Sequence, residues 1–175
     1  MTTTTAAAHR VHTVVESPVG PLTLVMAGGA LAGLYMRTRR HMPSPEIFGD
    51  EVAGTGDLFA GPAGQLRGYF TGQRTEFDLP LALAGTPFQR RVWAELQKIP
   101  YGETISYGEL AQRIGRPTAA RAVGLANGRN PVSIIVPCHR VVGADGSLTG
   151  YGGGMERKQH LLAFERGVRA ALTGR

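Results

Sequence analysis

The chain has a single cysteine, Cys138, and a histidine, His139, follows it directly in the segment VPCHRVV. A cysteine attacks as its thiolate, and a neighbouring imidazole is the usual group that removes the thiol proton. Adjacent side chains of a regular strand point to opposite faces, so this pair can cooperate only through an irregular backbone or a bridging water. Pro137 favours such a break at the end of the strand-like run SIIV. Cys138 is therefore a candidate nucleophile, and His139 is its candidate base.

The cysteine count excludes several other kinds of site. One cysteine cannot form an internal disulfide, and no C-x-x-C pair is present for a thiol redox couple or a thiolate zinc site. The remaining readings are a buried inert thiol, an exposed thiol or a nucleophile. We expect no metal and no cofactor.

Glu165 is a candidate for the carboxylate that orients the histidine. It lies in MERKQHLLAFERG, an expected helix, on the same face as the two leucines. A carboxylate on an apolar face is costly unless it is paired. Two readings stay open from the residues alone: Glu165 is the partner of His139, or it lies at the rim and pairs with Lys158 or Arg169.

Two short helices are expected before the cysteine. A helix capped by Ser106 ends at Gly115, and a second helix begins with Pro117 in its first turn, runs through TAARAVGLAN and stops at residues 127–128. This pattern is typical of a helix-turn-helix, although an ordinary helical hairpin fits it too. Arg121 projects from the second helix, where its small neighbours would let the backbone approach a groove. The alternative is a solvated surface arginine.

Charge differs between the two halves of the chain. Residues 1–85 have six Arg/Lys and seven Asp/Glu, whereas residues 86–175 have thirteen Arg/Lys and six Asp/Glu. Seventeen of the nineteen basic residues are arginine, which suits a polyanionic partner such as a nucleic acid; a solvated basic face is the alternative. No leader pattern is present, and no run approaches the roughly 20 apolar residues of a membrane helix. We expect a soluble, cytoplasmic protein with no membrane contact.

The first half reads as a small sheet. The β-rich runs HTVVES, LTLVMA and LAGLYM are separated by turn-forming residues, and a helix (DLFAGPAGQLRGYFTG) and a further strand (TEFDLPL) follow. After LPLALAGTP the pattern changes to helical spacing, and Trp93 on that helix is expected in the core. We place a domain boundary there, which gives domains 1–85 and 86–175.

Four segments resemble the O6-alkylguanine-DNA alkyltransferases, which are single-turnover DNA repair proteins. They are IPYGETISYGELA, AARAVGLANGRNP, IIVPCHRVVGADGSLTGYGGG and RKQHLLAFE, and they cover residues 86–166 closely. SPVGPLTL and LRGYFTG resemble the family's more variable amino-terminal domain. The resemblance implies an α/β (α+β) fold, with a small RNase H-like sheet domain and a mostly helical domain that contains the helix-turn-helix and the PCHR segment.

The resemblance also implies catalytic roles. Cys138 matches the alkyl acceptor, His139 the base that acts on it through a water, and Glu165 the carboxylate that orients the histidine. Asn130 resembles the asparagine that links the recognition helix to the active-site segment. Tyr107 matches the tyrosine that helps rotate the phosphate, contacts the flipped guanine and gives a proton to it.

The implied DNA contacts lie in the second helix, which enters the minor groove in this family. Arg121 matches the finger that replaces the extruded nucleotide. The other residues expected to contact DNA are Tyr107, Ala119, Ala120 and Gly124, and those expected to line the base pocket are Val141, Tyr151, Gly152 and Gly153. Gly152 stands where many relatives have serine, and Asn127 where some have an apolar residue, so the range of adducts that fit can differ.

The implied function is direct-reversal DNA repair. The alkyl group of O6-alkylguanine, and also of O4-alkylthymine, would pass to Cys138 in one turnover after the base is flipped. The expected partner is double-stranded DNA, bound by a monomer, with cooperative binding along DNA left open. The competing functions are a helix-turn-helix regulator, a cysteine hydrolase and a lesion-binding protein without turnover, whose pattern lacks the acceptor cysteine.

Overall fold

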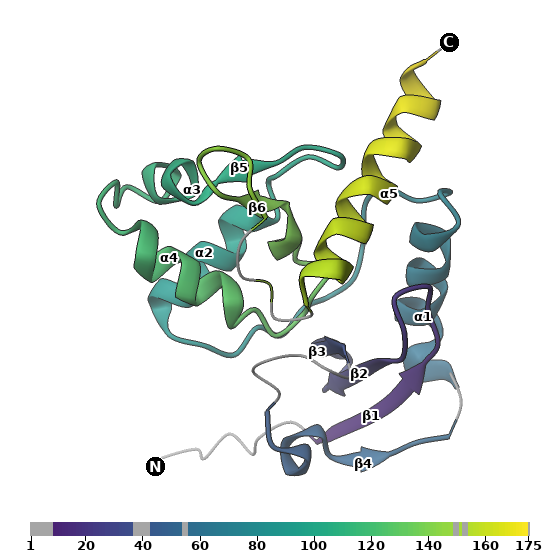
Figure 1. The fold of residues 1–175 in the computed structure, drawn as a ribbon. Coiled ribbons are helices and arrows are strands. Elements are labelled where there is room, and N and C mark those ends of the chain that lie inside the picture. The colour runs from purple at the N-terminus through teal and green to yellow at the C-terminus, as the bar shows by residue number, and fades with distance from the viewer. Residues whose placement is uncertain (1–8, 37–42, 54–55, 149–150, 152–153, 175) are drawn as a thin grey trace, which may run out of the picture.

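The computed structural model describes residues 9–36, 43–53, 56–148, 151 and 154–174 of the chain. A four-stranded sheet with one helix lies at one end of the molecule, and the remaining helices form the other part (Figure 1). The first part contains β1 (Arg10–Val15), β2 (Leu22–Ala27), β3 (Ala30–Met36), a 3₁₀ turn (Pro45–Phe48), β4 (Asp50–Glu51) and α1 (Asp57–Phe70). The second contains α2 (Pro87–Leu96), β5 (Ile105–Ser106), α3 (Tyr107–Arg113), α4 (Ala120–Gly128), a 3₁₀ turn (Cys138–Arg140), β6 (Val141–Val142) and α5 (Met155–Thr173).

The sheet is a meander with one added strand. Its order is β3-β2-β1-β4, where the first three strands are antiparallel and β4 runs parallel to β1. Gly28 and Gly29 both have positive φ, 57° and 83°, as a two-residue hairpin turn between β2 and β3 requires. The three strands predicted from the sequence are therefore confirmed, and α1 packs Phe59, Leu66 and Tyr69 into the core.

The predicted strand over TEFDLPL is wrong. Within residues 75–81 only Leu81 makes a bridge, to Leu31 of β3. Leu31 donates its N–H to the carbonyl of Pro80, and the N–H of Ala82 donates back to Leu31. Proline has no N–H to donate, so pairing does not extend beyond this point.

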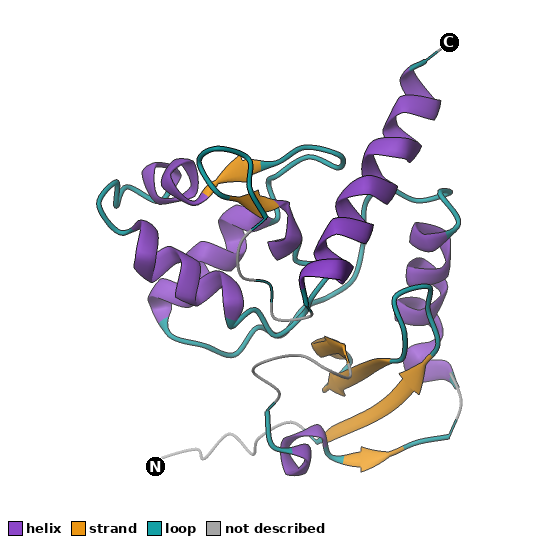
Figure 2. Ribbon diagram, viewed as in Figure 1, coloured by secondary structure: helices purple, strands orange, loops and turns teal. Residues whose placement is uncertain are grey.

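In the helical part, most of the helices, caps and helix ends predicted from the sequence are present. Thr86 and Gln89 form a reciprocal capping box at the start of α2, and the buried Trp93 donates to the carbonyl of Ala126 in α4 at 2.8 Å. The hydroxyl of Ser106 accepts from Glu109 N–H at 3.0 Å at the start of α3, and Gly115, with φ 74°, follows its end. Figure 2 shows these helices around the two short orange strands β5 and β6, apart from the larger four-stranded sheet.

The expected position of Pro117 inside the second helix is wrong. The helix starts at Ala120, because the N–H of Ala119 donates to the carbonyl of Arg116 and closes a separate turn around the proline. The run SIIV is also not a strand. The N–H of Val136 donates to Val132, the N–H of Ile135 donates to Ser133, and Ile134 has φ 73°. These turns set the irregular backbone that leads to Cys138.

The segment before Cys138 joins the first sheet. Leu34 of β3 bridges Val132, its N–H donates to Pro131 at 2.9 Å, and Ser133 N–H donates to Leu34 at 3.2 Å. α5 lies between α1 and the other helices (Figure 1). One hydrophobic cluster contains residues of both parts of the chain. The domain boundary between residues 85 and 86 therefore stays a prediction. Among the described residues, no helix is both long and apolar enough to span a bilayer.

Candidate active site

Cys138 begins a 3₁₀ turn rather than lying within a strand. Only 4% of its surface is exposed, and its N–H donates to the carbonyl of Val136 at 2.8 Å. Asn127, near the end of α4, donates its side-chain amide to the Cys138 carbonyl at 3.3 Å. The turn supplies the irregular backbone that a cooperating Cys138–His139 pair requires.

Asn130 lies two residues after α4 and holds the same segment. Its amide donates to the carbonyl of Val136 at 2.7 Å, and its carbonyl oxygen accepts from the N–H of Val132 at 3.0 Å. The side chain thus bonds to the backbone on both sides of the turns before Cys138. Because α4 is the expected DNA-reading helix, Asn127 and Asn130 tie that helix to the candidate nucleophile.

His139 and Glu165 form a fully buried pair. The Nε2 atom of His139 lies 2.8 Å from Oε2 of Glu165, and neither side chain is exposed. Burial alone would raise the pKa of Glu165, but the hydrogen bonds from His139 and Arg140 and the positive charge of Arg140 bring it well below its usual range. The reading that places Glu165 at the rim with Lys158 or Arg169 is wrong.

This geometry sets the tautomer of the histidine. An ionised carboxylate only accepts hydrogen bonds, so Nε2 of His139 carries the proton and Nδ1 keeps its lone pair. Nδ1 has no hydrogen-bond partner among the described residues. Burial lowers the pKa of His139, while Glu165 opposes that shift. The resting imidazole is therefore neutral and can accept a proton at Nδ1.

Two further side chains hold the Glu165 carboxylate. Arg140 donates from Nε to Oε1 at 2.8 Å and from Nη2 to Oε2 at 2.9 Å, and it also donates from Nη1 to the carbonyl of Ile99. Tyr69, on α1 of the first part, donates its hydroxyl to Oε2 at 2.7 Å, and the N–H of Gly102 lies 3.4 Å from Oε1. Burial and then the carboxylate raise the pKa of Tyr69. Neither Arg140 nor Tyr69 is among the site residues predicted from the sequence.

Lys158 is a second buried charge near the cysteine. It is fully buried on α5, its Nζ donates to the carbonyl of Val141 at 2.6 Å, and it lies 5.8 Å from the ring centroid of Tyr107. Burial lowers its pKa to about 8, although attraction to an ionised Cys138 favours the charged form. The ammonium of Lys158 and a thiolate at Cys138 therefore stabilise each other.

Short parallel strands position Tyr107 next to this site. Ile105 and Ser106 of β5 pair with Val141 and Val142 of β6, directly after the 3₁₀ turn. Tyr107 follows β5 as the first residue of α3, and its ring lies beside the backbone of Gly124 in α4. The tyrosine thus stands between the candidate DNA-reading helix and the buried lysine.

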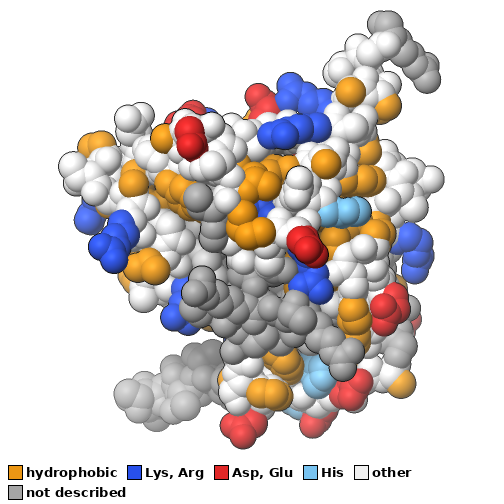
Figure 3. Space-filling model, in the orientation of Figure 1, with side chains coloured by type: hydrophobic (Ala, Val, Ile, Leu, Met, Phe, Trp, Pro, Cys, Tyr) orange, Lys and Arg blue, Asp and Glu red, His pale blue; other side chains and the backbone are white. Residues whose placement is uncertain are grey.

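The expected DNA contacts lie on an open side of α4. Arg121 is exposed and Ala119, Ala120 and Gly124 are half-buried. In Figure 3, acidic side chains occur at the lower end over the sheet and also near the top, and basic side chains occur on the side where α4 lies and also elsewhere on this face. Of the expected pocket residues, Val141 is fully buried and Tyr151 is buried. Gly152 and Gly153 lie outside the described residues.

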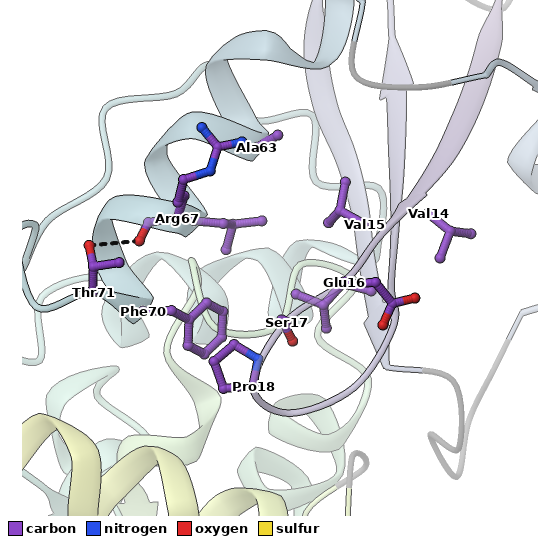
Figure 4. Close-up of a pocket in the computed structure, with 11 residues that line it drawn as sticks. Val14, Val15, Glu16, Ser17, Pro18, Ala63, Arg67, Phe70 and Thr71 are labelled. Carbon is purple, nitrogen blue, oxygen red and sulfur yellow. Dashed lines mark hydrogen bonds between the residues drawn. The ribbon is translucent and has the colours of Figure 1, made fainter.

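A separate apolar cavity of about 440 Å³ lies between β1, the turn after it, and α1 (Figure 4). Its hydroxyl groups are occupied within the chain: Ser17 donates to the carbonyl of Gly20 at 2.6 Å, and Thr71 donates to that of Arg67 at 2.9 Å. Glu16 supplies a carboxylate to the lining, but no histidine or cysteine is among the described residues that line the cavity. The chemistry of this chain is therefore assigned to the Cys138 site.

We expect stability to depend on pH through Lys158. Because its folded pKa of about 8 lies below its ordinary 10.5, the unfolded chain binds more protons between these values, and stability rises with pH. The gain from pH 8 to 10 should be on the order of 1–2 kcal/mol in the free energy of unfolding. Tyr101, with a pKa raised to about 12, acts in the opposite sense only above about pH 10. Denaturant titrations of the wild type and of Lys158→Met measure this; equal slopes against pH in both proteins would contradict it.

Comparisons with known proteins place two family models on the chain. Residues 11–83 match the ribonuclease-like domain of 6-O-methylguanine DNA methyltransferase, and residues 87–167 match its DNA binding domain. A methylated-DNA–protein-cysteine methyltransferase of Mycolicibacterium paratuberculosis is 57% identical over 152 residues, which is 87% of this chain and 90% of that protein. One from Methanosarcina acetivorans is 46% identical over 88% of this chain and 97% of its own length. The crystal structure of Mycobacterium tuberculosis OGT in complex with DNA has a TM-score of 0.84 and 52% identity, and covers 90% of this chain and 94% of that one.

Proposed function

The chain belongs to the 6-O-methylguanine DNA methyltransferase family, and on that premise we propose that it repairs alkylated DNA by direct reversal. It acts as a methylated-DNA–protein-cysteine methyltransferase and takes the alkyl group of O6-alkylguanine onto Cys138. The observation that carries this proposal is the buried arrangement in which Cys138 is followed by His139, whose Nε2 is bonded to the Glu165 carboxylate.

DNA binding comes first and uses α4 in the minor groove. The lesion atom is inside a stacked duplex, so the nucleotide has to be flipped out, at a cost of a few kcal/mol that is smaller for a poorly pairing base. Arg121, exposed on α4, takes the place of the extruded nucleotide in the stack. Tyr107 rotates the phosphate and contacts the flipped guanine near Val141 and Tyr151.

The chemical step is a displacement at the alkyl carbon. Nδ1 of His139 takes the Cys138 proton through a water, and Glu165 stabilises the imidazolium that forms. The thiolate then attacks the alkyl carbon, an S–C bond forms, and the C–O6 bond breaks with its electron pair passing to guanine. Tyr107 donates a proton to that guanine and regains one from solvent. A thioether is a poor leaving group, so each protein molecule acts once.

The competing functions fit the site less well. A transcriptional regulator requires the helix pair but not the buried Cys138 site, and a lesion-binding protein without turnover lacks the acceptor cysteine. A cysteine hydrolase would turn over a soluble ester or amide. We further propose that O4-alkylthymine is accepted, that the protein binds DNA as a monomer, and that it acts in the cytoplasm.

The test of this function is the stoichiometry of label transfer. A duplex with a radiolabelled methyl group on O6 of guanine is incubated with increasing amounts of protein, and label is counted in the protein fraction. We expect one methyl group per protein molecule and an unlabelled guanine in the DNA. Label released as methanol, or repeated turnover, would contradict the proposal.

An Arg121→Ala variant should separate base flipping from chemistry. Transfer from duplex DNA should slow by at least about tenfold, because nothing holds the stack open once the base has left it. Transfer from free O6-benzylguanine should change by less than about twofold, since a free base needs no extrusion. Rates are measured by single-turnover assays. Arg67→Ala, which removes an exposed arginine on α1, is the matched control. Equal losses on both substrates would show that Arg121 supports the active site instead.

A further inference from the structure

Leu125 on α4 is 69% exposed, which is more than Leu172 at the end of α5 (63%) or Leu58 on α1 (52%). A single exposed leucine is ordinary on a protein surface. Its position is the informative feature, because it lies on the helix that the proposed function places against DNA. The buried side of α4 is formed instead by Val123, Ala126 and Asn127.

Leu125 follows Arg121 by four residues, so the two side chains share one face of the helix, one turn apart. Tyr107 packs beside Gly124 on one flank of this face. On the other flank is a shallow hollow of about 290 Å³, lined by Leu125 and Arg129 and by residues at the start of α2 such as Phe88. The exposed leucine therefore stands between two arginines, Arg121 and Arg129, and beside an open hollow.

We propose that Leu125 enters the minor groove together with Arg121 and packs against the deoxyriboses of the strand opposite the extruded nucleotide. This rests on the proposed function, in which α4 enters that groove. Proteins that bind the minor groove use cationic side chains there and frequently insert apolar side chains as well. Arg121 and Arg129 supply the positive charge that a phosphate backbone requires on either side of such a wedge. Arg121 fills the vacated stack, and Leu125 excludes water from the groove wall beside it.

The inference predicts a loss of affinity without a loss of chemistry. Leu125→Ala should weaken binding to a duplex with O6-methylguanine by about tenfold, the effect of removing most of one buried leucine side chain. The slope of log affinity against log salt should stay the same, because no phosphate contact is removed. Transfer from free O6-benzylguanine should be unchanged, which also shows that the variant is folded. Leu125→Met should restore most of the affinity, and Leu58→Ala is the control for an exposed leucine elsewhere.

Any of the following results would overturn the inference. Affinity of Leu125→Ala within twofold of the wild type, or an equal loss in Leu58→Ala, means that the side chain does not contact DNA. A wild-type protein that forms dimers in sedimentation without DNA, and a monomeric Leu125→Ala, would make a second copy of this chain the occupant of the face. Failure of the wild type to take up the methyl group from a duplex with O6-methylguanine would overturn the proposed function, and so is distinguished from failure of this inference, which is read from duplex affinity.

Discussion

A Cys138→Ser variant is expected to bind duplex DNA with wild-type affinity and to transfer no alkyl group. Serine has nearly the size of cysteine, but its hydroxyl stays protonated near neutral pH, and a neutral hydroxyl is a far weaker nucleophile than a thiolate. The rate of transfer should fall by at least about 10³-fold, because the variant keeps the base but loses the group that it activates. Affinity should stay within about twofold, since Cys138 is only 4% exposed and the surface of α4 is untouched.

Two measurements on the same preparation check this prediction. Fluorescence anisotropy gives the affinity for the alkylated duplex, and a single-turnover assay gives the rate. Cys138→Ala serves as a second variant, because it removes the side-chain donor and acceptor altogether. Stoichiometric alkylation of either variant on another residue would overturn the assignment of the acceptor.

The second large effect is expected from Arg140→Met, which should lower the free energy of unfolding by about 3–5 kcal/mol. Glu165 is fully buried, and among the described residues Arg140 is the only cation bonded to it; its other donors, His139, Tyr69 and the N–H of Gly102, are neutral at rest. Removing the arginine leaves a buried carboxylate without a counter-charge. Such a carboxylate protonates more easily, so the pKa of Glu165 should rise.

The pH dependence of this variant follows from the sign of that shift. In the wild type the pKa of Glu165 is depressed, so its contribution to stability is present above the unfolded pKa and is lost as pH falls below about 4. In Arg140→Met that acid-side loss should shrink or reverse. Urea titrations of both proteins between about pH 2 and 7 measure it, because that range includes the acid side of the unfolded pKa. Adding Glu165→Gln to Arg140→Met should recover part of the stability, since the two residues are coupled.

Arg113→Met is the matched control for the loss of an arginine. Arg113 pairs with Glu109 at 2.9 Å on the surface of α3, where such a pair contributes at most about 1 kcal/mol. A loss in Arg140→Met no larger than in Arg113→Met would mean that Arg140 does not balance the charge of Glu165.

The secondary structure was predicted correctly where a single local rule, for a turn, a cap or an apolar face, determines it. The glycine pair of the β2–β3 hairpin, the Ser106 cap and the apolar face of α2 each act within a few residues, so they can be read directly. The errors occurred where a proline or a tertiary contact intervened. Pro80 ended a strand that the alternating pattern predicts, and Pro117 closed a turn in front of α4 instead of starting it.

Part of the site was also predictable, because its signals are local in the sequence. Cys138 and His139 are adjacent in sequence, and Glu165 was conspicuous as a carboxylate on an apolar helical face. Lys158 is likewise a charged residue on an apolar helical face, because it lies seven residues before Glu165 on the buried side of α5. No local pattern indicates Tyr69, because it reaches the carboxylate from the first part of the chain, 96 residues away. Such a contact is fixed only when the two parts pack together.

The central claim is that Cys138 is the alkyl acceptor, and peptide mapping by mass spectrometry tests it most directly. The wild-type protein is incubated with an excess of duplex containing O6-methylguanine and then digested, and each peptide is sequenced in the mass spectrometer. We predict one added methyl group, on the sulfur of Cys138 and on no other residue, in essentially every molecule. A methyl group found elsewhere, or an unmodified Cys138 in protein that has converted the lesion to guanine, would contradict the account.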